Sequence, residues 1–108
     1  MNYAVEITQD GRGGQDIYLE GGKRLAFDWE FSATGITIHV PSRQEWDAYC
    51  EKHNAAWAKG RRLEILGRVA REVRRQKAKS ARTEIKDHRV ELYFEDHWIF
   101  SLFRKMFH

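Results

Sequence analysis

The sequence contains few of the features that mark secreted or membrane-spanning proteins. Cys50 is its only cysteine, so no disulfide can form within the chain, and this is typical of proteins in a reducing cytoplasm. Glu6 interrupts the first residues where a signal peptide needs an apolar run, and no stretch approaches the roughly 18 apolar residues of a membrane span. We therefore expect a cytoplasmic protein.

The length and composition of the chain favour one folding unit. It has 108 residues, of which 42% are hydrophobic and 32% charged, a balance typical of globular proteins. A chain of this length can bury one core but is too short to bury two. We therefore predict a single domain that spans residues 1–108.

Alternation of apolar and polar residues predicts four strands in the first part of the chain. They cover residues 3–7, 17–19, 25–31 and 36–40. The connection over residues 32–35 sets Trp29 opposite Ile38 on the apolar face of the sheet. The same register sets Asp28 opposite His39 on the polar face.

The strands on either side of Gly21 can pair in two registers. A two-residue turn would send Ile17 to the charged face of the sheet. A three-residue loop over residues 20–22 pairs Ile17 with Leu25 and keeps the apolar side chains together. We therefore predict the three-residue loop, and we predict that the Gly-rich residues 9–16 form a flexible loop.

Two helices are predicted after the only proline, Pro41. Ser42 and Glu45 have the spacing of a capping box, and apolar residues then recur at helical spacing as far as His53. A longer helix is predicted from about residue 61 to residue 79. We expect both helices to pack on one face of the sheet.

The pattern of elements predicts an α+β fold. It is an antiparallel β-meander packed by two central helices, followed by a β-hairpin over residues 83–94 and a C-terminal amphipathic helix from Asp96. The core is predicted to contain large apolar side chains from the strands and from both central helices. These are Phe27, Trp29, Phe31, Ile38, Val40, Trp46, Leu66, Val69, Val73 and Leu92.

The segment over residues 59–82, which contains the predicted helix 61–79, holds nearly all of the net positive charge. Residues 59–82 hold ten basic and two acidic side chains, whereas residues 1–58 hold five basic and nine acidic ones. Several basic side chains fall on one side of the helix, in a stripe about 27 Å long. They are Arg61, Arg68, Arg71, Arg75 and Lys79. Such a stripe suits the phosphate backbone of a nucleic acid, and the alternative is a helix face that is solvated or paired with acidic residues.

The last residues of the sequence are unusually apolar. Seven large apolar side chains between residues 98 and 107 would cover an arc of about 200° on a helix, and docking on one core needs only about 100°. We expect a second copy of the chain or another protein to cover the surplus. The predicted interface residues are Trp98, Phe100, Phe103 and Phe107. Arg104 and Lys105 also permit a helix at a membrane surface, which we rank below self-association and consider unlikely as a partner.

The remaining residue combinations give weak signals for catalysis or metal binding. Cys50 and His53 have ligand spacing, but the sequence has no second cysteine, so packing of Cys50 in the core is favoured. Asp28, His39 and Glu30 could act in acid–base chemistry only within a pocket, and the polar face of any antiparallel sheet gives the same pattern. We therefore predict no metal site and no cofactor.

The sequence thus favours a non-enzymatic protein-interaction module that self-associates as a homodimer through its C-terminal aromatic helix. Phosphate-backbone binding by the basic helix 61–79 is the alternative. A small enzyme that uses the polar sheet face ranks third.

Overall fold

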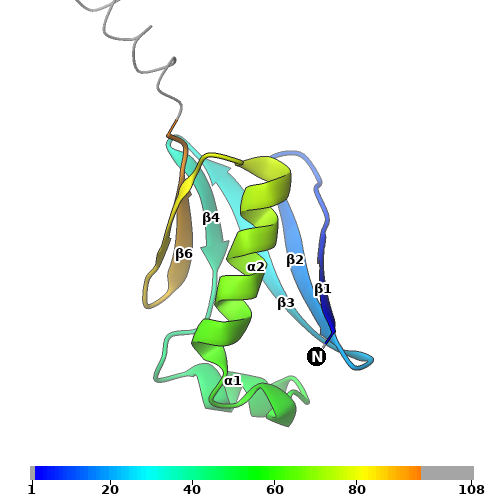
Figure 1. The fold of residues 1–108 in the computed structure, drawn as a ribbon. Helices are drawn as coiled ribbons and strands as arrows, with labels where there is room; N and C mark the ends of the chain where they lie inside the picture. Colours follow the sequence, from blue (N-terminus) through cyan, green and yellow to red (C-terminus); the bar gives the residue numbers. More distant parts are fainter. Residues whose placement is uncertain (1, 96–108) are drawn as a thin grey trace, which may run out of the picture.

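Six antiparallel strands form one curled sheet in the computed structural model, which describes residues 2–95 (Figure 1). The strand order is β1-β2-β3-β4-β6-β5. The strands are β1 (Tyr3–Ile7), β2 (Gly13–Glu20), β3 (Lys23–Ser32), β4 (Gly35–His39), β5 (Arg82–Ile85) and β6 (Arg89–Tyr93). The helices are α1 (Trp46–Lys52), the short 3-10 helix η1 (Ala56–Ala58) and α2 (Arg62–Lys77). The predicted α+β class is confirmed, whereas the helix predicted from Asp96 lies outside the described residues.

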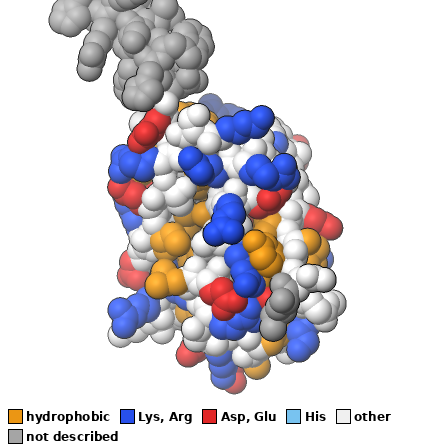
Figure 2. Space-filling model, in the orientation of Figure 1, with side chains coloured by type: hydrophobic (Ala, Val, Ile, Leu, Met, Phe, Trp, Pro, Cys, Tyr) orange, Lys and Arg blue, Asp and Glu red, His pale blue; other side chains and the backbone are white. Residues whose placement is uncertain are grey.

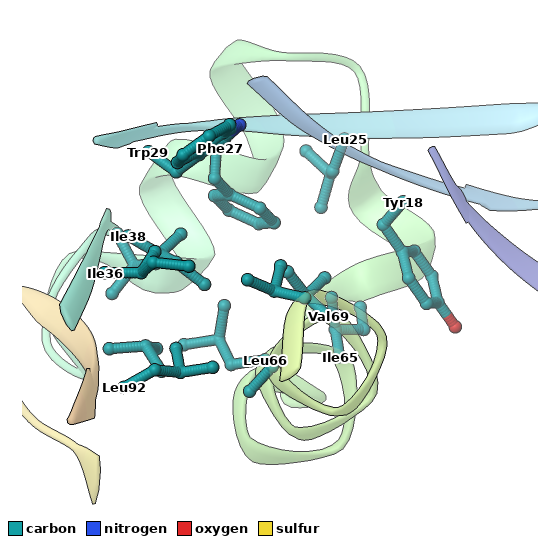
Figure 3. Close-up of a cluster of buried hydrophobic side chains, with 14 of the residues drawn as sticks. Tyr18, Leu25, Phe27, Trp29, Ile36, Ile38, Ile65, Leu66, Val69 and Leu92 are labelled. Atoms are coloured by element: carbon teal, nitrogen blue, oxygen red, sulfur yellow. The ribbon is translucent and has the colours of Figure 1, made fainter. Parts of the chain in front are cut away.

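The helix α2 lies across the concave face of the sheet and closes the core (Figure 1). Figure 3 shows Leu66 and Val69 of α2 pointing into the space that Ile38 lines from the sheet. Burying a side chain of this size contributes about 2 kcal/mol to folding. Every predicted core residue is buried except Phe31, which is half-buried and packs edge-on against Trp29 with the ring centroids 5.0 Å apart.

The helix α1 begins after the predicted capping interaction. The hydroxyl of Ser42 accepts a hydrogen bond from the backbone N–H of Glu45 at 3.1 Å and donates one to its carboxylate at 2.7 Å. The buried indole of Trp46 donates to the carbonyl oxygen of Ala58, which ties α1 to η1. Tyr49 donates to the carbonyl oxygen of Ala26, so α1 lies beside the part of β3 that β4 leaves unpaired.

The hairpin β5–β6 belongs to the same sheet as the meander, because β6 pairs with β4. Its register pairs Thr83 with Leu92 and sets Glu84 opposite Glu91. The repulsion between these carboxylates is relieved by cations and donors around them. Arg89 lies 3.1 Å from Glu91, and the hydroxyl of Thr37 donates to the same carboxylate at 2.9 Å.

The turn at Gly21 and Gly22 has two residues, so the predicted three-residue loop is wrong. Both glycines have a positive φ, of 58° and 77°, as a two-residue type I′ turn requires. The ladder pairs Tyr18 with Leu25 on the core face and sends Ile17 to the outer face, which also carries Asp28.

Tyr18 takes the core position because its ring packs in the core while its hydroxyl still finds hydrogen-bond partners. Its ring is fully buried, while its hydroxyl donates to Glu20 at 2.7 Å and accepts from Arg68 at 2.7 Å. A buried tyrosine is stable when its hydroxyl has such partners. The prediction treated Ile17 as the better core residue because it could not include partners from a distant helix.

The predicted loop over residues 9–16 is also too long, because β2 begins at Gly13. A Cβ atom at Gly14 would lie 2.1 Å from the carbonyl oxygen of Thr8. Gly14 is therefore required because β1 and β2 approach each other closely at this position. The position needs a residue without a side chain, not a flexible loop residue.

We expect Gly35→Ala to destabilise the protein and Gly67→Ala to stabilise it slightly. A Cβ atom at Gly35 would lie 1.7 Å from the carbonyl oxygen of Leu92, so β4 and β6 would have to separate. Overpacking of this kind costs about 3 kcal/mol. An added Cβ at Gly67 in α2 meets no atom within 4 Å, and alanine there should gain about 1 kcal/mol of helix propensity. Urea unfolding measures both changes, and equal midpoints for the two variants would contradict this packing.

Candidate functional site

The basic stripe of α2 divides into two parts with different partners. In the first part, Arg61 donates two hydrogen bonds to the carboxylate of Glu20, at 2.7 and 2.8 Å, and Arg68 lies 3.3 Å from the same carboxylate. Glu64 pairs with both arginines. Hydrogen bonds from Arg61 and then from Tyr18 lower the pKa of Glu20 to about 2. This part of the stripe holds α2 to β2.

The side chains of Arg61 and Arg68 are accordingly only 22% and 24% exposed. The guanidinium of Arg68 also lies over the ring of Tyr3, 4.4 Å from its centroid. A phosphate would have to displace these contacts to reach either arginine. Of the predicted nucleic-acid-binding residues, these two therefore have a structural role.

The second part of the stripe, nearer the end of α2, keeps much of its positive charge. Four cations around the end of α2, two from the predicted stripe and two from outside it, have no carboxylate within ion-pair distance among residues 2–95. We call them the basic end: Arg71, Arg74, Lys77 and Lys79. Arg74 and Lys77 donate to neutral acceptors, the carbonyl oxygen of Ala81 and the side-chain oxygen of Gln9. Figure 2 shows Lys and Arg side chains gathered over the upper part of this face.

Arg75 does not belong to the basic end, although it lies on the predicted stripe. Glu72 pairs with it at one-turn spacing, and hydrogen bonds from Arg75 and then Gln76 lower the pKa of Glu72 to about 2. Arg71 and Lys79 are therefore the stripe residues that stay without a carboxylate partner in the described part of the chain.

The basic end borders a small hollow of about 250 Å³, lined by Lys77, Lys79, Ser80 and Glu95 among others. Glu95 is the last described residue and pairs with Arg82 at 3.1 Å. In the chain, the apolar residues 98–107 begin three positions after Glu95. The predicted interface residues Trp98, Phe100, Phe103 and Phe107 themselves lie outside the described residues.

A larger hollow, of about 390 Å³, lies between α1 and β3, and its lining includes Asp28, His39, Tyr49 and His53. Asp28 lies opposite His39 as predicted, but the ring of His39 contacts Glu30, with Nε2 3.0 Å from Oε1. The side chains of His39 and Glu30 are 54% and 61% exposed. Such open surroundings do not enclose a substrate between the two groups, so this hollow is the weaker candidate site.

Cys50 is buried, and burial followed by the nearby Asp47 raises the pKa of its thiol to about 11. The thiol therefore stays protonated at neutral pH, and a protonated thiol is a poor nucleophile and a poor metal ligand. His53 packs on the ring of Tyr49, with centroids 4.3 Å apart. Residues 2–95 contain no group of three or more side chains placed to hold a metal ion.

Asp16 is the buried polar residue that the sequence prediction missed. It lies on the core face of β2 opposite Phe27, is fully buried, and has no hydrogen-bond partner among the described residues for either carboxylate oxygen. Burial raises its pKa to about 7. Alternation counted back from Tyr18 would have placed Asp16 in the core, but the Gly-rich neighbours had indicated a loop.

The chain matches no protein-family model, no characterised protein and no solved structure. No helix within residues 2–95 is long and apolar enough to cross a membrane. Function is therefore inferred from the geometry of the chain itself.

We expect Asp16 to make the protein less stable as the pH rises from about 4 to about 7. The folded state keeps this carboxyl group protonated in that range, whereas the unfolded chain, with a pKa near 3.8, releases the proton. The folded state then binds more protons, so the free energy of unfolding falls by about 1.4 kcal/mol per pH unit and levels off above about pH 7.

The variant Asp16→Asn removes this titration. Relative to wild type, its stability should rise by about 3 kcal/mol between about pH 5 and about pH 8, measured by urea unfolding. Glu6→Gln removes an exposed acid from β1 and should leave the wild-type pH dependence unchanged. Parallel pH profiles for wild type and Asp16→Asn would contradict the burial of a neutral acid.

Proposed function

We propose that this protein is a non-enzymatic interaction module that binds a partner surface through its apolar residues 98–107. In solution the partner is a second copy of the chain. The interface residues are Trp98, Phe100, Phe103 and Phe107.

One observation carries this proposal. The core formed by residues 2–95 is covered on its inner face by α2, and residues 98–107, which we call the apolar segment, are not needed to cover it. The helix α2 covers the concave face of the sheet, and the buried cluster reaches from Tyr18 to Leu92. Within these residues the exposed large apolar side chains are Tyr3, Leu63 and Phe94. Three separate side chains offer little apolar surface on which seven large apolar residues could pack, and this supports a second surface as their partner.

The open hollow and the protonated thiol support the non-enzymatic part of the proposal. The acid–base candidates His39 and Glu30 are more than half exposed, and Cys50 is not ionised at neutral pH. Neither feature provides an ionisable group that is both enclosed and reactive at neutral pH, as catalysis requires. The apolar segment is therefore a stronger indication of function than the acid–base pair or the thiol.

The double variant Phe100→Ser, Phe107→Ser should convert a dimer into a folded monomer. Each buried phenylalanine contributes about 2 kcal/mol to an interface, so the dimer should be lost at about 100 µM. The melting temperature of the monomer should change by less than about 5 °C, because the core is intact. Light scattering gives the mass, and calorimetry gives the melting temperature.

Leu63→Ser is the matched control, because Leu63 is 67% exposed on α2 and lies outside the segment. It should change neither mass nor melting temperature. If the double variant melts more than about 10 °C lower, the phenylalanines belong to the core of their own chain and the interaction module is rejected. A wild-type protein that is monomeric at about 100 µM, the concentration at which the dimer is expected, rejects the second copy as partner.

A further inference from the structure

The strand β1 lies at one edge of the sheet (Figure 1). The side of β1 that faces away from β2, which we call the free edge, pairs with no other strand within residues 2–95. β1 pairs one to one with β2 over its whole length, so no bulge bends the free edge away. No residue of β1 is buried, and Val5 and Ile7 are half-buried. The free edge therefore offers unpaired N–H and C=O groups to another strand.

The opposite edge of the sheet is protected against such pairing. It is formed by β5, which has only four residues. Two of them, Arg82 and Glu84, are charged and pair with each other. In β1 the only charged residue is Glu6, and the strand contains no proline. Short length, charge and proline are the usual means by which proteins block edge pairing, so β1 is the less protected of the two edges.

The direction of the backbone hydrogen bonds shows which residues of β1 can bind across the free edge. The N–H of Thr8, just after β1, donates to the carbonyl oxygen of Gln15 on β2 at 2.9 Å. Because bonded positions alternate along an antiparallel ladder, Ala4 and Glu6 also direct their backbone groups toward β2. The backbone groups of the remaining three residues therefore point to the free edge: Tyr3, Val5 and Ile7.

A second copy of β1 fits this edge in one register that pairs the whole strand. Bonded positions must lie opposite each other, and centring two antiparallel copies on Val5 achieves this. Tyr3 then lies opposite Ile7, and on the other face Ala4 lies opposite Glu6. Centring the pair on Glu6 would set two like charges against each other, and centring it on Ala4 would leave Ile7 without a strand partner. The edge is thus complementary to itself in pattern and in charge.

We propose that the free edge of β1 binds the free edge of β1 in a second copy of the chain, around a two-fold axis at Val5. The two sheets continue into each other, and each strand supplies the backbone partners that the other lacks. A contact between two five-residue strands is smaller than the roughly 1,000 Å² of a stable interface, so the copies exchange. The contact uses no interface residue of the proposed function and does not rest on it.

Disulfide cross-linking of the full chain tests this register. In the proposed pair, the Cα atom of Ala4 lies about 4.5 Å from that of Glu6 in the second copy, which is within disulfide range. Two copies of Ala4, or two of Glu6, lie about 7 to 8 Å apart, which is too far. An equal mixture of Ala4→Cys and Glu6→Cys should therefore form mainly the mixed disulfide under mild oxidation, above the share of about half that random collision gives. Both positions are exposed, and the native Cys50 is buried.

Thr83→Cys is the matched control, because Thr83 is also exposed but lies on β5 at the opposite edge. Mixed with Glu6→Cys, it should give only the random share of the mixed disulfide. A random share for Ala4→Cys with Glu6→Cys as well would reject a second copy as the occupant of the free edge and overturn the proposal.

Val5→Pro removes the central hydrogen bonds of the pair. Proline lacks the N–H that Val5 directs to the free edge, and it leaves the ladder with β2 in place. In chains with Val5→Pro, the yield of the mixed disulfide should fall to the random share. Chains with Val5→Ala keep the N–H and should retain the mixed disulfide. Melting temperatures show that both variants are folded, and equal cross-linking of the two would contradict pairing through the backbone.

Two outcomes separate this inference from the proposed function. If the wild type is monomeric by light scattering but the mixed disulfide predominates, self-association through the apolar segment is rejected and the β1 contact stands. If the added changes Phe100→Ser and Phe107→Ser abolish the mixed disulfide in folded chains, the free edge does not bind a second copy by itself. The β1 contact is then overturned, and the interaction module stands.

Discussion

The packing of α2 against the concave face of the sheet is the contact on which the rest of the structure depends. It buries Leu66, Val69 and Val73 against side chains from the strands, and without it the curled sheet would expose its whole inner face. The start of the helix is fixed by Arg62, which donates to the carbonyl oxygens of Pro41, Lys86 and Asp87 at 2.7 to 3.0 Å. Because one side and one end of α2 are fixed in this way, its remaining cations are held at the opposite end of the molecule.

Contacts with other parts of the fold, and not the helix sequence, decide which cations of α2 are neutralised. Glu20 on β2 neutralises Arg61 and Arg68, and it does so because the two-residue turn brings that carboxylate beside the helix. No strand carboxylate reaches Arg71 or Lys79 within residues 2–95. A uniform basic stripe in the sequence thus becomes an ion-pair cluster at one end of α2, while the cations at the other end have no carboxylate partner within residues 2–95.

The burial of Asp16 shows that the core is not optimised for stability at every position. A carboxyl group without a hydrogen-bond partner in the described structure lies where an apolar residue would be more favourable, and it stays neutral because ionisation there is costly. The same strand supplies Tyr18 and Glu20, which hold α2. Slipping β2 by one residue would expose Asp16 but would also remove Tyr18 from the core and Glu20 from Arg61, so the strand keeps its register at the expense of one buried acid.

The sequence by itself determined the elements whose contacts are local. The pairing of Trp29 with Ile38 and of Thr83 with Leu92 follows from alternation across short turns, and the apolar face of α2 follows from helical spacing. Tertiary structure decided whether Ile17 or Tyr18 faces the core, since the hydroxyl of Tyr18 is satisfied by Arg68, a residue 50 positions away. It also decided that β6 extends the meander and which cations of the stripe are paired. The physical reason is that an ion pair or a buried hydroxyl is stabilised by partners that only the folded chain brings together, whereas periodicity reports only which side of an element is apolar.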